Sequence, residues 1–363
     1  MRAARRQLVH DEGCEVSCAR DIFFARLTIA LLRCRGIIPE GDGGESRGSV
    51  DALSEVLGTL PTFVLRAGGH EPVSFALDPD LVEAIDTDPL ALGWAYQFWN
   101  DSERDAATKG VSRRGEGLTG HGEVAVVTQL FTEGYMASFL IERALGGGQN
   151  GSAPLGDESG DVLDPACGVG HILVPFLRAL RARGNNSEGS LSNGCEALSR
   201  LHGADIDEMA VEVCRVLLLV ESGVSSPAAC KDAWSTVCSN VVHLFSPWGT
   251  LDRTDSSPIL CRRYRHVVTN PPYIGRRKLN EETREFLDRY YPATSMDLCA
   301  AFMERCLELT HDGGTIGLVT VDKWLRLKPY ESLRVGGGGF VGLYRAVSLD
   351  VVCELGHRAF SSV

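Results

Sequence analysis

The sequence lacks any apolar run of the roughly 18 residues that a membrane-spanning helix requires. The longest candidate, Ile22 to Leu32, is interrupted by Arg26. The first residues are rich in arginine but mixed with acidic residues, and no apolar signal core follows, so we expect neither a secretory nor a transit peptide. These absences predict a soluble, cytoplasmic protein with no membrane partner.

Closely spaced cysteine pairs are also missing. None of the 12 cysteines falls in a CxxC pair, and the closest two are Cys14 and Cys18. Cys214, Cys299 and Cys306 lie in apolar, helix-like segments. The pattern is typical of buried, reduced thiols in a cytosolic protein, and it predicts neither a disulfide framework nor a metal site.

Positive charge is scarce over the whole chain, whose net charge is −12. A protein that binds nucleic acid needs cations near the phosphates, so their local distribution matters more than the total. Between Cys261 and Leu279 there is no carboxylate, and the cations are Arg262, Arg263, Arg265, Arg276, Arg277 and Lys278. This segment is either an ordinary solvated surface or a basic rim that holds a polyanion.

Within that segment, the β-rich run Tyr264–Val268 leads into Thr269-Asn270-Pro271-Pro272-Tyr273. Two successive prolines withhold two backbone donors and fix φ near −65°, so the strand must end and leave free carbonyls. A side-chain amide and an aromatic ring on such a stiff turn suit a planar group that carries an NH2, such as adenine. An ordinary proline turn after an edge strand is the alternative.

A second motif, Asp164–Leu173, reads as a strand end, a tight glycine turn and the start of a helix. Gly168 and Gly170 allow the backbone to approach a ligand closely. The turn is not GxGxxG and has no Walker lysine, so phosphate binding is not indicated. Asp164 instead suits a ligand with an ammonium and a sulfonium group, because a carboxylate pairs with positive charge.

Two further acidic residues follow predicted strands. Asp205 is placed to accept both hydroxyls of a ribose, and Asp207 reads as the cap of the next helix. Ala228–Trp234 is predicted as a short third strand that ends near Asp232, although a plain turn aspartate is equally compatible.

The region before these motifs, residues 1 to about 125, is predicted to be mostly helical. Asp78 caps a helix with Pro79 at its first position, and the aromatic run Leu92–Asn100 is assigned to the core. Glycine-rich breaks at 39–48 and 109–122 are predicted as loops. Thr132 is expected to cap a helix that runs to Leu145.

Taken in order, TQLFTEGYM, DPACGVGHIL, GADIDEMAV and TNPPY resemble the class I S-adenosylmethionine-dependent DNA adenine-N6 methyltransferases. With the helical N-terminus, WAYQFWN and VTQLFT, the chain is similar to methyltransferases of BREX phage-defence systems and to fused restriction–modification enzymes. The likeness covers roughly Leu92 to the C-terminus. It implies site-specific methylation of adenine N6 in DNA, with the adenine flipped out of the duplex and defence-system subunits as possible partners.

The resemblance also implies a doubly wound, mostly parallel, seven-stranded Rossmann-like α/β sheet. We expect a helical N-terminal region over 1–125 and a methyltransferase domain over 126–363. Relatives continue into a region that reads the DNA sequence, which this chain lacks after Phe360, so it is expected to be a fragment or one part of a split enzyme.

Residue roles follow from the same resemblance. The cofactor, S-adenosyl-L-methionine, is expected to be held by Thr132, Asp164, Ala166, Gly168, Gly170, Asp205 and Asp232. Lys231 stands before Asp232, where the family usually has Gly or Asn. The catalytic turn is Asn270, Pro271, Pro272 and Tyr273, and substrate contacts are expected from Tyr273, Phe360, Arg276, Arg277 and Lys278.

Other substrate classes remain compatible with the same turn. A glutamine side-chain amide and an RNA base amine are also planar NH2 groups, so an RNA or protein-glutamine N-methyltransferase is an alternative. A catalytically degenerate DNA-binding subunit is a second alternative.

Overall fold

A five-stranded parallel sheet organises the chain. The computed structural model describes residues 2–11, 14–39, 46–68, 77–114, 132–145, 160–184 and 194–347. The strands are β1 Val162–Asp164, β2 Leu201–Asp205, β3 Val241–His243, β4 Tyr264–Thr269 and β5 Thr310–Leu318, in the order β3-β2-β1-β4-β5. The expected α/β class with a parallel sheet is confirmed, and the expected seven strands stay a prediction.

Strands β1, β2 and β4 are almost entirely buried because helices cover both faces of the sheet. Successive side chains of a strand point to opposite faces. Val162 and Val268 accordingly join one apolar cluster, whereas their neighbours Leu163 and Val267 join another. This explains why β1 and the end of β4 are apolar throughout rather than alternating, as is typical of parallel sheets.

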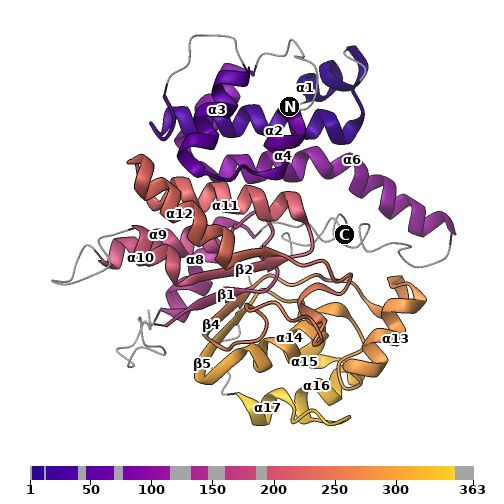
Figure 1. Cartoon of the computed structure of the whole chain (residues 1–363). Coiled ribbons are helices and arrows are strands. Elements are labelled where there is room, and N and C mark those ends of the chain that lie inside the picture. The colour runs from indigo at the N-terminus through magenta and orange to yellow at the C-terminus, as the bar shows by residue number, and fades with distance from the viewer. Residues whose placement is uncertain are drawn as a thin grey trace.

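One face of the sheet packs against helices from residues 134–240, and the other face packs against helices from residues 281–346. The first face carries α8 Gly134–Ala144, α9 Leu173–Gly184, α10 Gly194–Ser199, α11 Glu208–Ser222 and α12 Pro227–Asn240. The other side of the sheet carries α13 Glu281–Tyr290, α14 Leu298–Leu309, α15 Lys323–Arg326, α16 Glu331–Val335 and α17 Leu343–Ala346 (Figure 1). Short helical turns are η2 Gly249–Leu251, η3 Arg276–Lys278 and η4 Lys328–Tyr330.

The N-terminal helices form a further tier above α11 and α12 (Figure 1). They are α1 Arg2–Arg6, η1 Gln7–Asp11, α2 Val16–Cys34, α3 Ser46–Leu57, α4 Thr62–Gly68, α5 Pro79–Thr87 and α6 Leu90–Arg114. Their buried side chains belong to the same apolar cluster as those of α11 and α12. Polar contacts also cross this boundary, because the Trp234 indole donates to the Thr59 hydroxyl at 3.1 Å and the Glu212 carboxylate accepts from the Phe63 amide at 3.3 Å.

Several local predictions are confirmed. Asp78 caps α5 through a hydrogen bond from the Asp80 amide at 3.1 Å, and Pro79 occupies the first turn. Tyr96 and Trp99 of the aromatic run are buried, whereas Trp94 and Phe98 are 39% and 38% exposed. No helix in the described part of the chain is long and apolar enough to cross a membrane.

Three local predictions are wrong. Residues 228–234 are not a strand but part of α12, because Ser226 accepts from the Ala229 amide as a cap and Pro227 starts the helix. The third strand lies after this helix, as β3. The loop expected over 109–122 overlaps α6, which continues to Arg114. Thr132 is not the helix cap, since α8 begins one residue later, after Glu133.

We expect the N-terminal helices and the sheet to unfold together, because buried side chains of both belong to one apolar cluster. Leu27 in α2 and Leu217 in α11 are both fully buried. Leu27→Ala and Leu217→Ala should each lower the free energy of unfolding by about 2–5 kcal/mol. Urea denaturation followed by circular dichroism and tryptophan fluorescence should show one coincident transition that both substitutions shift.

Leu65→Ala is the matched control, since Leu65 is 55% exposed on α4 and should cost no more than about 0.5 kcal/mol. Two separate transitions, each moved by only one of the buried substitutions, would contradict a shared core.

Candidate functional site

The strand order reverses between β1 and β4, and the site lies at this reversal. Strands β1, β2 and β3 extend to one side, whereas β4 and β5 extend to the other. In open parallel sheets such a point leaves a crevice at the carboxyl ends of the strands, where ligands bind. Here the strand ends are Asp164 and Thr269, and the Thr269 hydroxyl donates to Asp164 Oδ1 at 2.7 Å. The two motifs recognised in the sequence therefore meet at one edge of the sheet.

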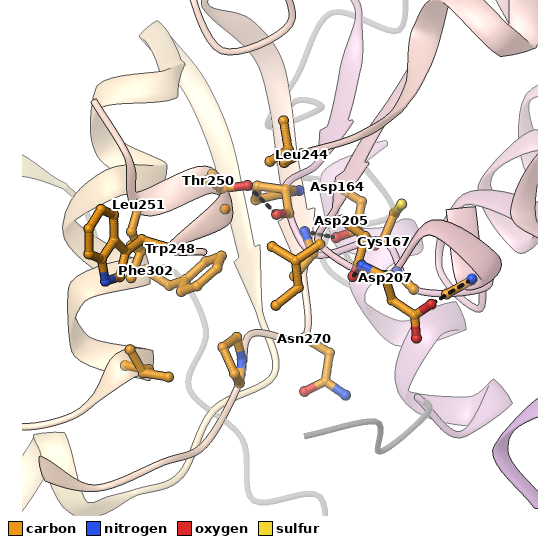
Figure 2. A pocket seen from close by; sticks show the side chains of 18 of the residues that line it. Asp164, Cys167, Asp205, Asp207, Leu244, Trp248, Thr250, Leu251, Asn270 and Phe302 are labelled. Atoms are coloured by element: carbon orange, nitrogen blue, oxygen red, sulfur yellow. Dashed lines mark hydrogen bonds between the residues drawn. The ribbon is translucent and has the colours of Figure 1, made fainter. Parts of the chain in front are cut away.

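A pocket opens at this edge, and its two sides differ in chemistry. One side is polar and includes Thr132, Asp164, His171, Asp205, Asp207 and Asn270. The other side is apolar and includes Leu244, Trp248, Leu251, Pro272, Leu298 and Phe302. Figure 2 shows Asp164, Asp205 and Asp207 on one side of the pocket and Trp248 and Phe302 on the other, with Asn270 between the two sides. An elongated ligand with a charged end and a flat apolar end would match this division.

The glycine turn after β1 is tied to the end of β2. The Gly168 amide donates to Asp205 Oδ2 at 2.8 Å, and the Cys167 amide donates to the Ala204 carbonyl at 3.0 Å. Gly168 has a positive φ of 49°, which favours glycine. The turn therefore brings its backbone and Ala166 into the pocket wall.

Gly170 serves packing rather than lining the pocket. Its φ is 92°, and a Cβ on it would lie 2.8 Å from the Cys214 sulfur. Glycine at this position lets the turn sit directly on α11. Gly170 is not among the residues that line the pocket, so its expected contact with a cofactor remains a prediction.

Burial raises the pKa of two of the pocket acids. Desolvation raises the pKa of Asp164 to about 7, although hydrogen bonds from Thr269 and Ala166 oppose the shift. Burial and then the nearby charge of Asp207 raise the pKa of Asp205 to about 6. These carboxylates are costly to ionise in the free protein, so a positively charged ligand or hydroxyl donors would stabilise their ionised form.

The amide of Asn270 is oriented by contacts on both of its ends. Its Nδ2 donates to the Thr132 hydroxyl at 3.2 Å, and its Oδ1 accepts a hydrogen bond from the Tyr273 hydroxyl. The Tyr273 hydroxyl also lies 2.7 Å from the Val319 carbonyl. Burial raises the pKa of Tyr273, so the hydroxyl stays protonated and can donate. The Asn270 amide is thereby held between the Thr132 hydroxyl and the Tyr273 hydroxyl at the pocket wall.

The prolines of the turn have different places. Pro272 lines the pocket, whereas Pro271 is buried behind it. The Tyr273 ring is half-buried against the main apolar cluster and is not among the lining residues. Its expected stacking on a base remains a prediction. Phe360 lies outside the described residues.

Asp232 does not reach the pocket, which corrects its expected role. It lies exposed on α12. After Ala210, the next residue along the chain that lines the pocket is Leu244, which follows β3. The amide of Leu244 donates to the Asp205 carbonyl at 2.8 Å, which places the segment after β3 beside the ribose-binding candidate. The predicted third strand over 228–234 is wrong, and the actual third strand, β3, begins after Asp232 at Val241.

The cations of the predicted basic rim are not gathered around the turn. Arg262 and Arg263 precede β4 and Arg265 is its second residue, so most or all of the strand separates them from the diproline turn. They contact the Asp161 carboxylate, the Asp312 carboxylate at 3.6 Å and the Gly313 carbonyl at 2.7 Å respectively. The rim is therefore limited to η3, after the turn.

Within η3, the three predicted substrate cations also differ. Arg276 forms a bidentate pair with Asp288 at 2.6 and 2.8 Å. Arg277 and Lys278 are exposed, and no ion pair of theirs is seen among the described residues. Two of the three cations are thus available to a polyanion.

Sequence reasoning missed the apolar wall. Trp248 stacks on Phe286 with ring centroids 4.2 Å apart and planes 3° apart, and Phe302 comes from α14. The Thr250 hydroxyl donates to the Pro165 carbonyl at 2.5 Å, which holds η2 against the turn after β1. A Pro-Trp-Gly sequence between the second strand and the diproline turn was the one available signal for this wall.

Comparison with known proteins agrees with the motifs. The Eco57I restriction-modification methylase family matches residues 199–335. The chain is 22% identical over 385 residues to the adenine-specific methyltransferase PglX of Lacticaseibacillus casei (strain Zhang), covering 75% of this chain and 31% of that protein. It is also 22% identical over 440 residues to the adenine-specific methyltransferase BrxX of Escherichia coli O9:H4 (strain HS), covering 87% and 35%.

The chain thus spans about a third of the length of these relatives. Among solved structures, the DrdV–DNA complex matches with a TM-score of 0.45 and 12% identity, covering 87% of this chain and 31% of that one. The resemblance to adenine-specific methyltransferases of BREX and restriction–modification systems is confirmed by the named relatives and the matching family.

Asp164 should destabilise the free protein as the pH rises. Its pKa is raised to about 7 in the folded chain, from an ordinary value of 3.8, so the folded state holds a proton that the unfolded state releases. Stability is therefore lost between about pH 4 and pH 7. Asp164→Asn should raise the free energy of unfolding at pH 8 by roughly 2–4 kcal/mol, and by much less at pH 4.

Urea denaturation at pH 4, 6 and 8 measures this difference, with Asp51→Asn on the exposed side of α3 as the control for the same chemical change. A gain that is equal at all three pH values would mean that Asp164 does not titrate in this range.

Proposed function

We propose that this chain transfers a methyl group from S-adenosylmethionine to the N6 amine of adenine in DNA, as part of a BREX-type defence or restriction–modification system. The observation that carries the proposal is the hydrogen bond between Thr269 and Asp164, which places a candidate cofactor pocket and the Asn270 turn side by side. The names of the relatives support the same reaction and substrate.

The pocket fits S-adenosylmethionine at both of its ends. Asp164 offers a carboxylate to positive charge, and both oxygens of Asp205 retain acceptor capacity for ribose hydroxyls beside the backbone amides that they already bind. The apolar side, with Trp248 and Phe302, fits a purine ring. When bound, S-adenosylmethionine supplies a methyl group on a sulfonium that departs as a neutral thioether.

Asn270 and Pro271 act on the target amine. The lone pair of adenine N6 is delocalised into the ring, and it becomes nucleophilic when both N–H groups are accepted by the Asn270 carbonyl oxygen and the Pro271 backbone carbonyl. The Tyr273 and Thr132 contacts hold the Asn270 amide in the orientation that accepts. No strong base is needed, because positioning alone can lower such a barrier by about 7–11 kcal/mol. After the new N–C bond has formed, the methylated N6 is positively charged and releases one proton to water.

DNA is the substrate class that we propose. The adenine leaves the duplex to reach the pocket, as enzymes that modify bases in DNA require. We assign the exposed Arg277 and Lys278 to phosphate contacts next to the turn, whereas Arg276 is held by Asp288. Stacking of Tyr273 and Phe360 on the flipped base belongs to the same proposal, as do the site-specificity of the enzyme and defence-system subunits as partners.

The finer architecture is also proposed rather than observed. We assign residues 1–125 to a helical N-terminal region and 126–363 to a methyltransferase domain with a seven-stranded Rossmann-like sheet. The parallel order of the five described strands and the reversal between β1 and β4 support this assignment.

Labelled cofactor tests the substrate class directly. The chain should transfer a methyl group from radiolabelled S-adenosylmethionine to duplex DNA, and digestion to nucleosides followed by mass spectrometry should show N6-methyladenine. Parallel reactions contain RNA and whole-cell protein. Label only in RNA or only in protein would replace DNA as the substrate, and failure to bind the cofactor at all would indicate a degenerate subunit.

Asn270→Ala should abolish turnover while leaving the cofactor bound. Loss of one oriented acceptor at the reacting amine should lower the methylation rate by about 10²–10³-fold. The Kd for S-adenosylmethionine, measured by calorimetry, should change by no more than about threefold. The reason is that Asn270 contacts the target amine, whereas the cofactor is bound by Asp164 and Asp205.

Asn240→Ala is the control, since Asn240 ends α12 and binds the Leu198 and Ser199 carbonyls away from the pocket. Equal losses of rate and cofactor binding in Asn270→Ala would contradict its assigned role.

Cofactor affinity should fall on acidification. The pKa of Asp164 is about 7 and that of Asp205 about 6 in the free protein, and both must be ionised to bind the ligand as proposed. The Kd for S-adenosylmethionine should therefore rise steadily from pH 8 to pH 5.5. Calorimetry over this range measures it, and Asp164→Asn should remove the part of the dependence near pH 7. A pH-independent Kd would argue against charge pairing at Asp164.

A further inference from the structure

Helix α6 reaches the pocket from the N-terminal helical region. The Tyr96 hydroxyl donates to the Asp207 carboxylate, with distances of 2.8 Å to Oδ2 and 3.0 Å to Oδ1. Tyr96 is 1% exposed, so this is an interior contact rather than a surface one. Asp207 lines the pocket and also caps α11, because its Oδ1 accepts from the Ala210 amide at 3.1 Å.

The same turn of α6 touches a second residue of the pocket wall. A Cβ on Gly93 would lie 2.8 Å from Val169 and 2.9 Å from the His171 ring, so only glycine allows the helix to lie this close. The Trp94 ring meets His171 edge to face, with centroids 4.7 Å apart. His171 lines the pocket, and burial lowers its pKa to about 3, so it is a neutral part of the wall.

Asp207 in turn positions Asp205. The Asp207 amide donates to Asp205 Oδ1 at 3.0 Å, while the Gly168 amide holds Oδ2. A shift of Asp207 would therefore move the carboxylate proposed to accept the ribose hydroxyls. Burial, and secondarily the Asp207 charge, raise the pKa of Tyr96 well above its ordinary value, so its hydroxyl remains a donor at every working pH.

We propose that Tyr96 is a positioning residue of the ligand pocket, through which the N-terminal helical region fixes Asp207 and Asp205 for binding of an adenosine-bearing ligand. The inference rests on the proposed function, because it takes S-adenosylmethionine as the ligand. It adds that helix α6, none of whose described residues lines the pocket, supports the pocket wall from behind through Tyr96.

Tyr96→Phe removes only the hydroxyl and keeps the packing of the ring. Binding of S-adenosylmethionine to the full chain, measured by calorimetry, should weaken by about 5–20-fold, in line with loss of one hydrogen bond to a charged group. Tyr264→Phe is the matched control. Tyr264 is also fully buried and its hydroxyl donates to the Ile259 carbonyl at 2.9 Å, but it lies at the far end of β4.

Both substitutions should lower the melting temperature, since each removes hydrogen bonding from a buried hydroxyl. Only Tyr96→Phe should change binding. It should also shift the acid limb of the binding profile to higher pH, because the Asp207 charge beside Asp205 would be less neutralised. The other groups that face Asp205 are Asp164 and Cys167, and neither substitution alters them.

Asp207→Ser shows whether Tyr96 acts through Asp207. Serine retains the ability to cap α11 but is too short to keep the same contact with Tyr96. Adding Tyr96→Phe to Asp207→Ser should produce no further loss of affinity.

Two results would overturn the inference. One is unchanged binding in Tyr96→Phe, and the other is an equal loss in Tyr264→Phe. If the unsubstituted chain binds S-adenosylmethionine in both cases, the proposed function stands and only the role of Tyr96 fails. Absence of binding by the unsubstituted chain would instead remove the proposed function and this inference together.

Discussion

The hydrogen bond from the Thr269 hydroxyl to Asp164 is the contact on which the site depends. It joins the carboxyl ends of two neighbouring parallel strands that are 105 residues apart in the chain. Asp164 is almost fully buried, so its carboxyl group needs the donors that Thr269 and the Ala166 amide provide. Thr269 immediately precedes the diproline turn, and Ala166 belongs to the turn after β1. Because both donate to the same carboxyl group, these hydrogen bonds also hold the two turns close together. The pocket is a consequence of that arrangement, not a separate feature.

The pocket combines groups that cost stability with groups that restore it. Carboxylates buried at Asp164 and Asp205 resist ionisation, as their raised pKa values indicate. Across the pocket, Trp248 and Phe302 contribute apolar surface, and Trp248 is backed by a stacked Phe286. An adenosine-bearing cation satisfies both sides at once, because it brings positive charge to the carboxylates and an aromatic ring to the apolar wall.

The helical N-terminal region is integrated with the sheet rather than attached to it. Its apolar side chains continue the cluster formed by α11 and α12, and Trp234 and Glu212 make polar contacts with residues before position 69. Helix α6 extends this integration to the pocket through Gly93 and Tyr96. A boundary drawn near residue 125 therefore separates stretches of sequence, but it does not separate two packing units in the described part of the chain.

The sequence by itself determined the features that depend on neighbouring residues. The strand before the diproline turn, the glycine turn after β1 and the caps at Asp78 and Asp207 all follow from local backbone constraints, and all are present. Tertiary structure decided which distant residues share the site. Asp232 is not part of the pocket, because it lies exposed on the capped helix α12. Trp248 and Phe302, which were not predicted, line the pocket. Tertiary structure also separated cations that are close in sequence, because β4 places its two ends at opposite edges of the sheet. The physical reason is that backbone geometry and capping act over a few residues, whereas pocket walls arise from strand order and packing between segments far apart in the chain.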